Sequence, residues 1–173
     1  MIKPDLKNRI SVIKDLEVQI LKEPVRFYRL KKLNTLMSAR HNLRLQFYND
    51  HIQDPELLAL LESEAKDFIV FQKTLTISFG KSNTEFATTL QSIVDTCKQC
   101  EFLNSKNIHS TAQDSVDSIE SQLLASNNVM KNYRLRQIQK CKTILSQYSV
   151  ENIENKTRSI DCCIGLDKEE LGE

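Results

Sequence analysis

Two cysteines three residues apart, Cys97 and Cys100, are the residues of this sequence whose spacing comes closest to a chemical site. A C-x-x-C pair can act as a redox couple when it opens a helix after a strand, because the positive end of the helix lowers the thiol pKa. It can also supply half of a zinc site, which then needs a second pair of ligands. Here the pair lies inside a segment with helical periodicity, and its candidate co-ligands are Cys162, Cys163 and His109. Adjacent cysteines chelate poorly from one helix, so the sequence favours thiols that fill an apolar core.

Other catalytic patterns are missing from the sequence. The three histidines, His41, His51 and His109, are scattered, and none stands in a pattern with a cysteine, serine or carboxylate that is typical of nucleophilic catalysis. The chain has three glycines and no glycine-rich phosphate loop, which argues against mononucleotide binding. The sequence therefore predicts no catalytic residues, no metal ligands, no cofactor and no small-molecule substrate.

Charge is unevenly distributed along the chain, although the net charge is only +1. Seven basic residues and one acidic residue lie from Lys22 to Arg44, five basic and no acidic residues from Lys131 to Lys142, and six acidic residues and one lysine from Asp50 to Asp67. One interpretation is that basic and acidic helices neutralise each other within the fold. The other is that stretch 22–44 contacts an acidic protein, a phosphate backbone or an anionic membrane, with an affinity that falls as salt rises. Arginine suits paired contacts with carboxylates or phosphates, so the candidate contact residues are Arg26, Arg29, Arg40 and Arg44.

The longest uninterrupted helical pattern runs from Thr111 to Ile160, fifty residues without glycine or proline. Apolar side chains recur there at intervals of three and four residues, which is the spacing that lines one face of a helix. A single helix of that length would extend about 75 Å at roughly 1.5 Å per residue, further than any other predicted helix could cover. We therefore expect its second part to pair with another polypeptide, as a homo- or hetero-oligomer, through Met130, Tyr133, Ile138, Leu145 and Tyr148.

The rest of the sequence divides into shorter helical segments. Helices are predicted over 5–22, 25–51, 55–79 and 82–103, each bounded by proline, glycine or capping residues. The segment 55–103 should fold as a helical hairpin, because only about three polar residues separate its two helices. Residues 104–107 are either a turn or a soft point within one continuous helix.

Composition agrees with an all-helical chain. The 173 residues include three prolines, three glycines and no tryptophan, and 40% of them are hydrophobic. We predict an all-α fold: an elongated, coiled-coil-like antiparallel bundle of four to five helices. It would form one domain, 1–164, with its long C-terminal helix over about 110–160 and an acidic tail, 165–173. No run is long enough for a transmembrane segment and the first residues lack the apolar core of a secretion signal, so we expect a cytoplasmic or nuclear protein that is not secreted.

One segment resembles a known family. Residues 134–156, RLRQIQKCKTILSQYSVENIENK, are similar to the closing helix of sorting-nexin-type BAR domains, in which a lysine, a leucine, a tyrosine and an isoleucine recur at comparable spacing. In this sequence those positions are Lys142, Leu145, Tyr148 and Ile153. The resemblance implies a dimer that binds curved, anionic membranes through basic residues.

These features favour a non-catalytic role. The first hypothesis is a structural or adaptor subunit that joins a multiprotein assembly by helix–helix docking, with apolar stripes giving affinity and the basic stretch 22–44 giving orientation. The second is a BAR-like dimeric module that binds anionic, curved membranes in vesicle trafficking. The third is a subunit of a nucleic-acid- or chromatin-associated complex that uses the same basic stretch.

Overall fold

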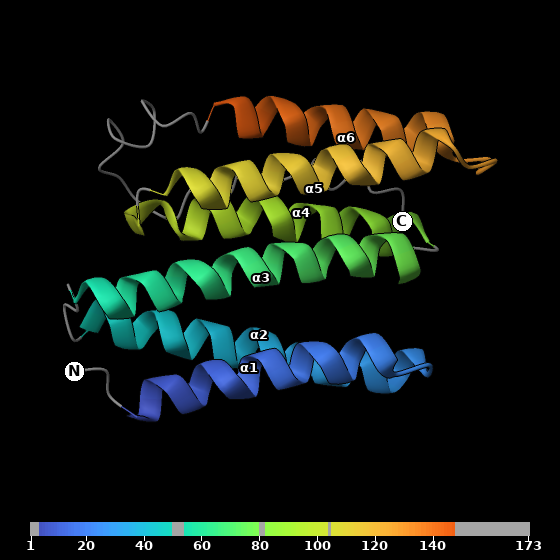
Figure 1. Ribbon diagram of the computed structural model, residues 1–173. Helices are drawn as coiled ribbons and strands as arrows, with labels where there is room; N and C mark the ends of the chain where they lie inside the picture. Colours follow the sequence, from blue (N-terminus) through green and yellow to red (C-terminus); the bar gives the residue numbers. More distant parts are fainter. Residues whose placement is uncertain (1–3, 50–53, 80–81, 104, 148–173) are drawn as a thin grey trace. The chain divides into compact units, whose positions relative to one another are not determined.

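The structure is a computed structural model, and it describes residues 4–49, 54–79, 82–103 and 105–147 (Figure 1). These residues form six α-helices and one short 3₁₀-helix, and none of them lies in a strand. The elements in chain order are α1 (Pro4–Lys22), α2 (Arg26–Asn49), α3 (Pro55–Phe79), α4 (Asn83–Gln99), the 3₁₀-helix η1 (Glu101–Leu103), α5 (Lys106–Leu124) and α6 (Lys131–Ser146). The all-α prediction is confirmed for this part of the chain, which has six α-helices rather than four to five.

Contacts between Cα atoms divide the chain into two compact units, Met1–Glu64 (unit 1) and Ala65–Glu173 (unit 2). The boundary falls inside α3. No proline, glycine or polar linker marks it, because the helix runs through it without interruption. The usual compositional signals of a domain boundary are therefore missing at this position.

In unit 1, α1 and α2 pack against each other as a helical hairpin (Figure 1). Pro24 separates them, since a proline lacks the N–H that a continuous helix needs. Glu23 stabilises the turn: its carboxylate accepts hydrogen bonds from the backbone N–H of Val25 at 3.2 Å and from Nζ of Lys32 at 3.3 Å. The first of these bonds lowers the pKa of the Glu23 carboxyl. Fully buried side chains, spaced seven residues apart along each helix, are Leu6, Ile13, Ile20, Leu36 and Leu43.

The turn between α3 and α4 forms where the capping signals predict it. Ser82 is the N-cap of α4, and its hydroxyl oxygen accepts a hydrogen bond from the backbone N–H of Glu85 at 3.1 Å. Serine followed three residues later by glutamate is the capping-box arrangement. The hydroxyl groups of Thr76 in α3 and Thr89 in α4 form a hydrogen bond of 2.6 Å, so the chain reverses direction between these two helices.

In unit 2, helices α4, α5 and α6 pack against one another. Nε of Arg134, at the start of α6, donates to Oδ1 of Asn83, at the start of α4, over 3.2 Å, so these two helices run in the same direction. The His109 ring, in the first turn of α5, contacts the backbone oxygen of Leu145 near the end of α6, so α5 runs opposite to α6 (Figure 1). Side chains from all three helices form one core, including Leu90, Ile93, Val94, Ala112, Val116, Ile138 and Cys141.

The segment 104–107 contains the start of a new helix and does not continue the preceding one. α4 ends at Gln99, η1 follows, and α5 begins at Lys106. Ser105 is the N-cap of α5, where its hydroxyl oxygen accepts the backbone N–H of Ile108 at 3.2 Å. The alternative of one continuous helix through this segment is therefore wrong, and Asn104 lies outside the described residues.

The single helix predicted over about 110–160 is wrong, because α5 and α6 are separated by a turn over 125–130. The Ser126 hydroxyl donates to a carbonyl oxygen in the last turn of α5 at 2.7 Å, and Oδ1 of Asn128 accepts the backbone N–H two residues later at 2.7 Å. Serine and asparagine side chains compete in this way with helical backbone hydrogen bonds. They end the helix although the segment has neither glycine nor proline. The remainder of the predicted helix and the acidic tail fall in 148–173, outside the described residues.

Candidate functional site

One side of α2 presents large apolar side chains to solvent. Four of them are 40 to 60% exposed: Phe27, Leu30, Met37 and Leu45. At 3.6 residues per turn these positions fall within about 80° of arc on the helix. Leu36, which is fully buried, lies on the opposite side. We call the four exposed side chains together with Lys31 the α2 outer face.

The same helix is strongly basic. α2 holds six lysine and arginine residues and neither aspartate nor glutamate. Nζ of Lys31 lies 4.8 Å from the centroid of the Phe27 ring, so a cation and an aromatic surface are presented together. Arg26 is exposed at the start of the helix, whereas Nη1 of Arg29 donates to the carbonyl oxygen of Glu23 at 3.1 Å and helps to close the turn between α1 and α2.

Arg40, predicted as a contact residue, does not belong to this surface. Its side chain is 2% exposed, and Nε lies 2.7 Å from Oε1 and 3.2 Å from Oε2 of Glu64 in α3. Arg40 is therefore an internal component of unit 1. Arg29 and Arg44 are half-buried, which leaves Arg26 as the exposed member of the four predicted arginines. Glu64, which pairs with Arg40, lies 24 residues further along the chain. No local sequence pattern therefore distinguishes Arg40 from the other three arginines.

The contact residues predicted near the C-terminus lie mostly inside unit 2. Ile138 and Leu145 are 0 and 1% exposed and belong to its core. Tyr133 is half-buried, Met130 is 39% exposed just before α6, and Tyr148 lies outside the described residues. Ile138 and Leu145 are covered in this structure because the turn between α5 and α6 lets α6 fold back along α5. The chain itself then covers the stripe that a continuous helix would have left exposed.

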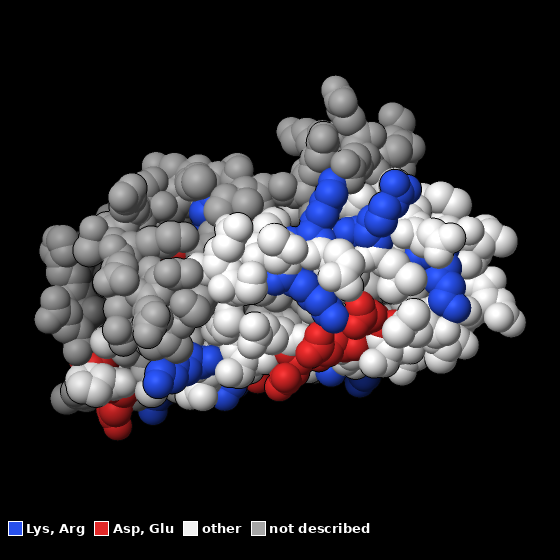
Figure 2. All heavy atoms as spheres, turned by 90° about the horizontal axis from the view of Figure 1, so that it is seen from above, with Lys and Arg blue, Asp and Glu red and all other residues white. Residues whose placement is uncertain are grey.

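Basic side chains of α6 have acidic neighbours on α5. Nζ of Lys142 lies 2.6 Å from Oε1 of Glu120 and 3.4 Å from Oδ1 of Asp117. The hydrogen bond that Nζ of Lys142 donates to Glu120 raises the pKa of Lys142, so it favours the charged ammonium. Figure 2 shows acidic side chains directly beside basic ones on the face that it presents. Neutralisation within the fold therefore accounts for this part of the basic segment 131–142.

The cysteine pair lies in the core of unit 2. Cys97, Cys100 and Cys141 are buried thiols. Burial raises the pKa of the Cys141 thiol to about 12 and raises that of Cys97 as well. The thiolate is the form that attacks disulfides and binds metals, and these surroundings disfavour it. Across the described ranges, no three His, Cys, Asp or Glu side chains are grouped as metal ligands would be, and Cys162 and Cys163 fall outside those ranges.

Iodoacetamide should modify Cys97 and Cys141 much more slowly in the native protein than in the unfolded chain. Few thiolates form at either position near neutral pH, and the reagent cannot reach them, so we expect a rate at least about 100-fold lower. Mass spectrometry of peptides after native and denaturing labelling measures both rates. A Ser121→Cys variant supplies an exposed reference thiol on α5. Native labelling of Cys141 as fast as this reference would contradict its burial.

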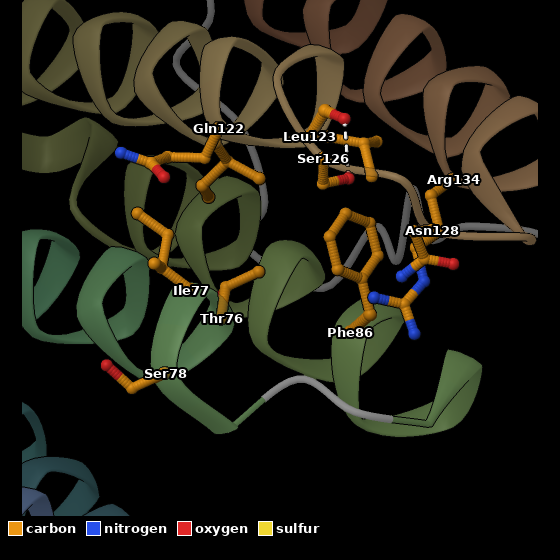
Figure 3. Close-up of a pocket in the computed structure, with 10 residues that line it drawn as sticks. Thr76, Ile77, Ser78, Phe86, Gln122, Leu123, Ser126, Asn128 and Arg134 are labelled. Carbon is orange, nitrogen blue, oxygen red and sulfur yellow. Dashed lines mark hydrogen bonds between the residues drawn. The ribbon is translucent and has the colours of Figure 1, made fainter.

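A polar pocket of about 440 Å³ lies in unit 2, between the end of α3 and the turn that joins α5 to α6 (Figure 3). Its lining comes from α3, α4, α5, α6 and that turn. Arg134 lies at one side, where its guanidinium carbon is 4.7 Å from the centroid of the Phe86 ring. No sequence pattern identifies this pocket, because its residues are of common types and only the packing of four helices brings them together.

The described residues thus define an all-α protein with an exposed apolar and basic helix, a buried ion pair and a polar pocket. Comparison of the chain with protein-family models, with curated proteins and with solved structures finds no significant match. Among the helices described, none is both long enough and apolar enough to cross a membrane. Function therefore has to be inferred from the surfaces of the chain itself.

Proposed function

We propose that the protein is a non-catalytic docking subunit of a larger assembly, in which the α2 outer face binds an acidic, amphipathic helix of another protein. The composition and exposure of α2 carry this proposal: the helix has six basic residues and no acidic residue, and four exposed large apolar side chains lie on one side of it. Contiguous exposed apolar surface rimmed by polar residues is typical of interaction sites. A partner helix with apolar residues at three- and four-residue spacing would match the spacing of these anchors.

Charge complementarity specifies the chemistry of the partner. Lys31 lies on the face itself, so a carboxylate that flanks the partner's apolar stripe would pair with this cation of α2. Beside this face on the helical wheel is a hollow of about 410 Å³, lined by residues of α1 and α2 that include Val12 and Asn42. It offers space for side chains that project from the partner helix.

Typical free energies indicate that the apolar contacts and the ion pairs would have different roles in binding. Burying one leucine or methionine side chain contributes about 1.5–3 kcal/mol, whereas an exposed ion pair contributes about 0–1 kcal/mol. Apolar contacts made by Leu30 and Met37 would therefore supply most of the affinity. The basic side chains would set the orientation of the partner and accelerate its association.

The same face supports a second candidate, the surface of an anionic membrane. An amphipathic helix that combines aromatic and basic side chains, as Phe27 and Lys31 do here, can lie in the interfacial region of a bilayer. The BAR resemblance of segment 134–156 implies the same kind of target. In that segment, however, the charge of Lys142 is paired with acidic neighbours and Leu145 is buried. Phosphate contacts to a nucleic acid would leave the apolar anchors unused, which disfavours the third hypothesis.

The double variant Leu30→Ser/Met37→Ser tests the docking role because it removes two anchors without changing charge. Its matched control is Val18→Ser/Val70→Ser, which changes two exposed apolar side chains on α1 and α3. Each tagged full-length protein is purified from its own cells after treatment with a carbodiimide, a reagent that joins lysines to nearby carboxylates. Quantitative mass spectrometry should show a protein that the control retains and the double variant loses by at least about tenfold. That protein should be linked to Lys31 through an aspartate or glutamate.

An unchanged set of bound proteins in the double variant would contradict protein docking at this face. Co-sedimentation with vesicles that contain phosphatidylserine separates the second candidate. If the wild type and the control bind these vesicles and the double variant does not, the α2 outer face is a membrane-binding surface.

A further inference from the structure

The turn between α5 and α6 presents the most exposed large apolar side chain among the described residues. Val129 is 95% exposed, and Leu124 before the turn and Met130 after it are 54 and 39% exposed. Nζ of Lys131 donates to the backbone oxygen of Leu124 at 2.9 Å, so the two sides of the turn lie close together. Figure 1 shows the turn at one extremity of the α5–α6 pair. We call Leu124, Val129 and Met130 the apolar tip of unit 2.

The apolar tip projects from the fold and does not line a cavity. Its three side chains belong neither to the lining of the pocket in unit 2 nor to that of the hollow on α1 and α2. A folded partner would need a pocket of matching shape to cover such a projection. The interfacial region of a fluid bilayer needs no matching shape, because lipids rearrange around the side chains that enter it.

Several backbone polar groups of this turn have partners within the turn itself. Nζ of Lys131 also donates to the backbone oxygen of Ser126 at 3.1 Å, and the Ser126 hydroxyl donates to that of Leu123 at 2.7 Å. Oδ1 of Asn128 accepts the backbone N–H of Met130 at 2.7 Å. Transfer of a polar group from water into an apolar medium is unfavourable unless the group is hydrogen-bonded. These bonds therefore make it easier for the apolar tip to leave water.

The chain on both sides of the tip favours an anionic target. The sequence over 121–150 contains no aspartate or glutamate, and Glu120, which precedes it, lies 2.6 Å from Nζ of Lys142. Arg136 is exposed on α6, and its guanidinium carbon is 5.8 Å from the centroid of the Tyr133 ring, which lies one turn closer to the tip. Since helical side chains point towards the N-terminus of their helix, this cation is directed towards the tip, where Lys131 also lies.

We propose that the apolar tip of unit 2 inserts into the interfacial region of an anionic membrane, while Lys131 and Arg136 contact its headgroups. At roughly 1.5 Å per residue, Arg136 lies about 9 Å along α6 from Met130. Apolar faces of interfacial segments reach about 5–10 Å into the boundary between headgroups and acyl chains, so the cation would stay at the level of the headgroups. The tip belongs to unit 2 and the α2 outer face to unit 1, so the two surfaces can be tested separately.

Co-sedimentation of the full-length protein with vesicles of phosphatidylserine and phosphatidylcholine tests the apolar contact. Leu124→Ser/Val129→Ser should weaken binding at least about tenfold, because it removes two inserting side chains. The matched control, Val70→Ser/Ile77→Ser, changes two exposed apolar side chains of α3 in the same unit and should bind as the wild type does. So should Leu30→Ser/Met37→Ser, which alters α2 alone. Absence of wild-type binding, or loss of binding in the α2 variant but not in the tip variant, would overturn the proposal.

A pair of charge variants tests the requirement for an anionic surface. Arg136→Gln should weaken binding to these vesicles by about fivefold, the typical contribution of one basic side chain near anionic lipid. Lys106→Gln makes the same charge change at an exposed position at the opposite end of α5 and should leave the affinity unchanged. Equal affinities of the two variants, or equally tight wild-type binding to vesicles of phosphatidylcholine alone, would contradict the contact with anionic headgroups.

Tryptophan fluorescence locates the inserted segment, because the chain contains no tryptophan of its own. Emission from Val129→Trp should shift to shorter wavelength when vesicles are added, and lipids with brominated acyl chains should quench it. The control is Gln113→Trp, at an exposed position of α5 about 16 Å before Leu124, and neither change should occur there. Unchanged emission from Val129→Trp, or equal quenching at both positions, would show that the tip does not enter the bilayer.

Discussion

Replacing Arg40 with methionine should lower the free energy of unfolding of unit 1 by about 3–5 kcal/mol, because it leaves the buried carboxylate of Glu64 without its partner. The side chains of Arg40 and Glu64 are 2 and 3% exposed, and Nε lies 2.7 Å from Oε1. Without the guanidinium, the Glu64 side chain would lose its hydrogen-bond partner at a position where water cannot replace it. Methionine is similarly long and flexible, so it retains much of the packing and isolates the loss of charge.

Hydrogen exchange at the backbone amides of α1 and α2 measures this effect in unit 1 directly. The double variant Arg40→Met/Glu64→Met removes both charges and should recover most of the lost stability, since apolar replacements of buried ion pairs are often neutral. Arg26→Met, at an exposed position of the same helix, should change the stability by about 0.5 kcal/mol or less. Equal effects of Arg40→Met and Arg26→Met would show that the ion pair is not buried in solution.

The internal role of Arg40 also changes what α2 can offer to a partner. Stretch 22–44 has a high density of basic residues, but Arg40 is bonded to Glu64 and Lys32 lies 3.3 Å from Glu23. The charge available at the α2 outer face is therefore smaller than the sequence alone implies. The exposed apolar side chains become correspondingly more important, which is why the proposed docking is tested by removing Leu30 and Met37 and not by removing charge.

Local signals in the sequence were sufficient to place most helices. Ser82 caps α4 as its spacing from Glu85 predicts, and Oδ1 of Asp54 accepts the backbone N–H of Glu56 at 2.9 Å at the start of α3. Such signals work because a helix end is satisfied by side chains only two or three residues away. Helical periodicity likewise placed Ile138 on one apolar face of its helix, although it could not show that the chain itself covers this side chain.

Features that depend on distant residues were not predictable in the same way. Arg40 and Arg26 are the same residue type in one helix, and only Glu64, in a different helix, separates their roles. The pocket at Arg134 needs the packing of four helices before it exists. The turn over 125–130 did have a local signal in its serine and asparagines, but these residues also occur within helices, and no glycine or proline reinforced them.

Ile138→Ala should lower the free energy of unfolding of the isolated protein by about 2–5 kcal/mol, because it opens a cavity in the core of unit 2. Ile138 is 0% exposed and shares this core with side chains of α4 and α5. Met130→Ala is the matched control, since Met130 was predicted on the same stripe but is 39% exposed. Chemical denaturation of the purified proteins should show a change of about 1 kcal/mol or less for this control.

The comparison separates two roles that the sequence pattern of α6 leaves open. An exposed side chain that binds a partner contributes little to the stability of the isolated chain, so its truncation weakens the complex and leaves the free energy of unfolding unchanged. Truncation of a core side chain lowers the free energy of unfolding of the isolated chain. If Ile138→Ala and Met130→Ala had equally small effects on unfolding, α6 would not be packed onto α4 and α5 in solution. The apolar stripe of α6 would then be available to a second polypeptide, as a continuous helix would have made it.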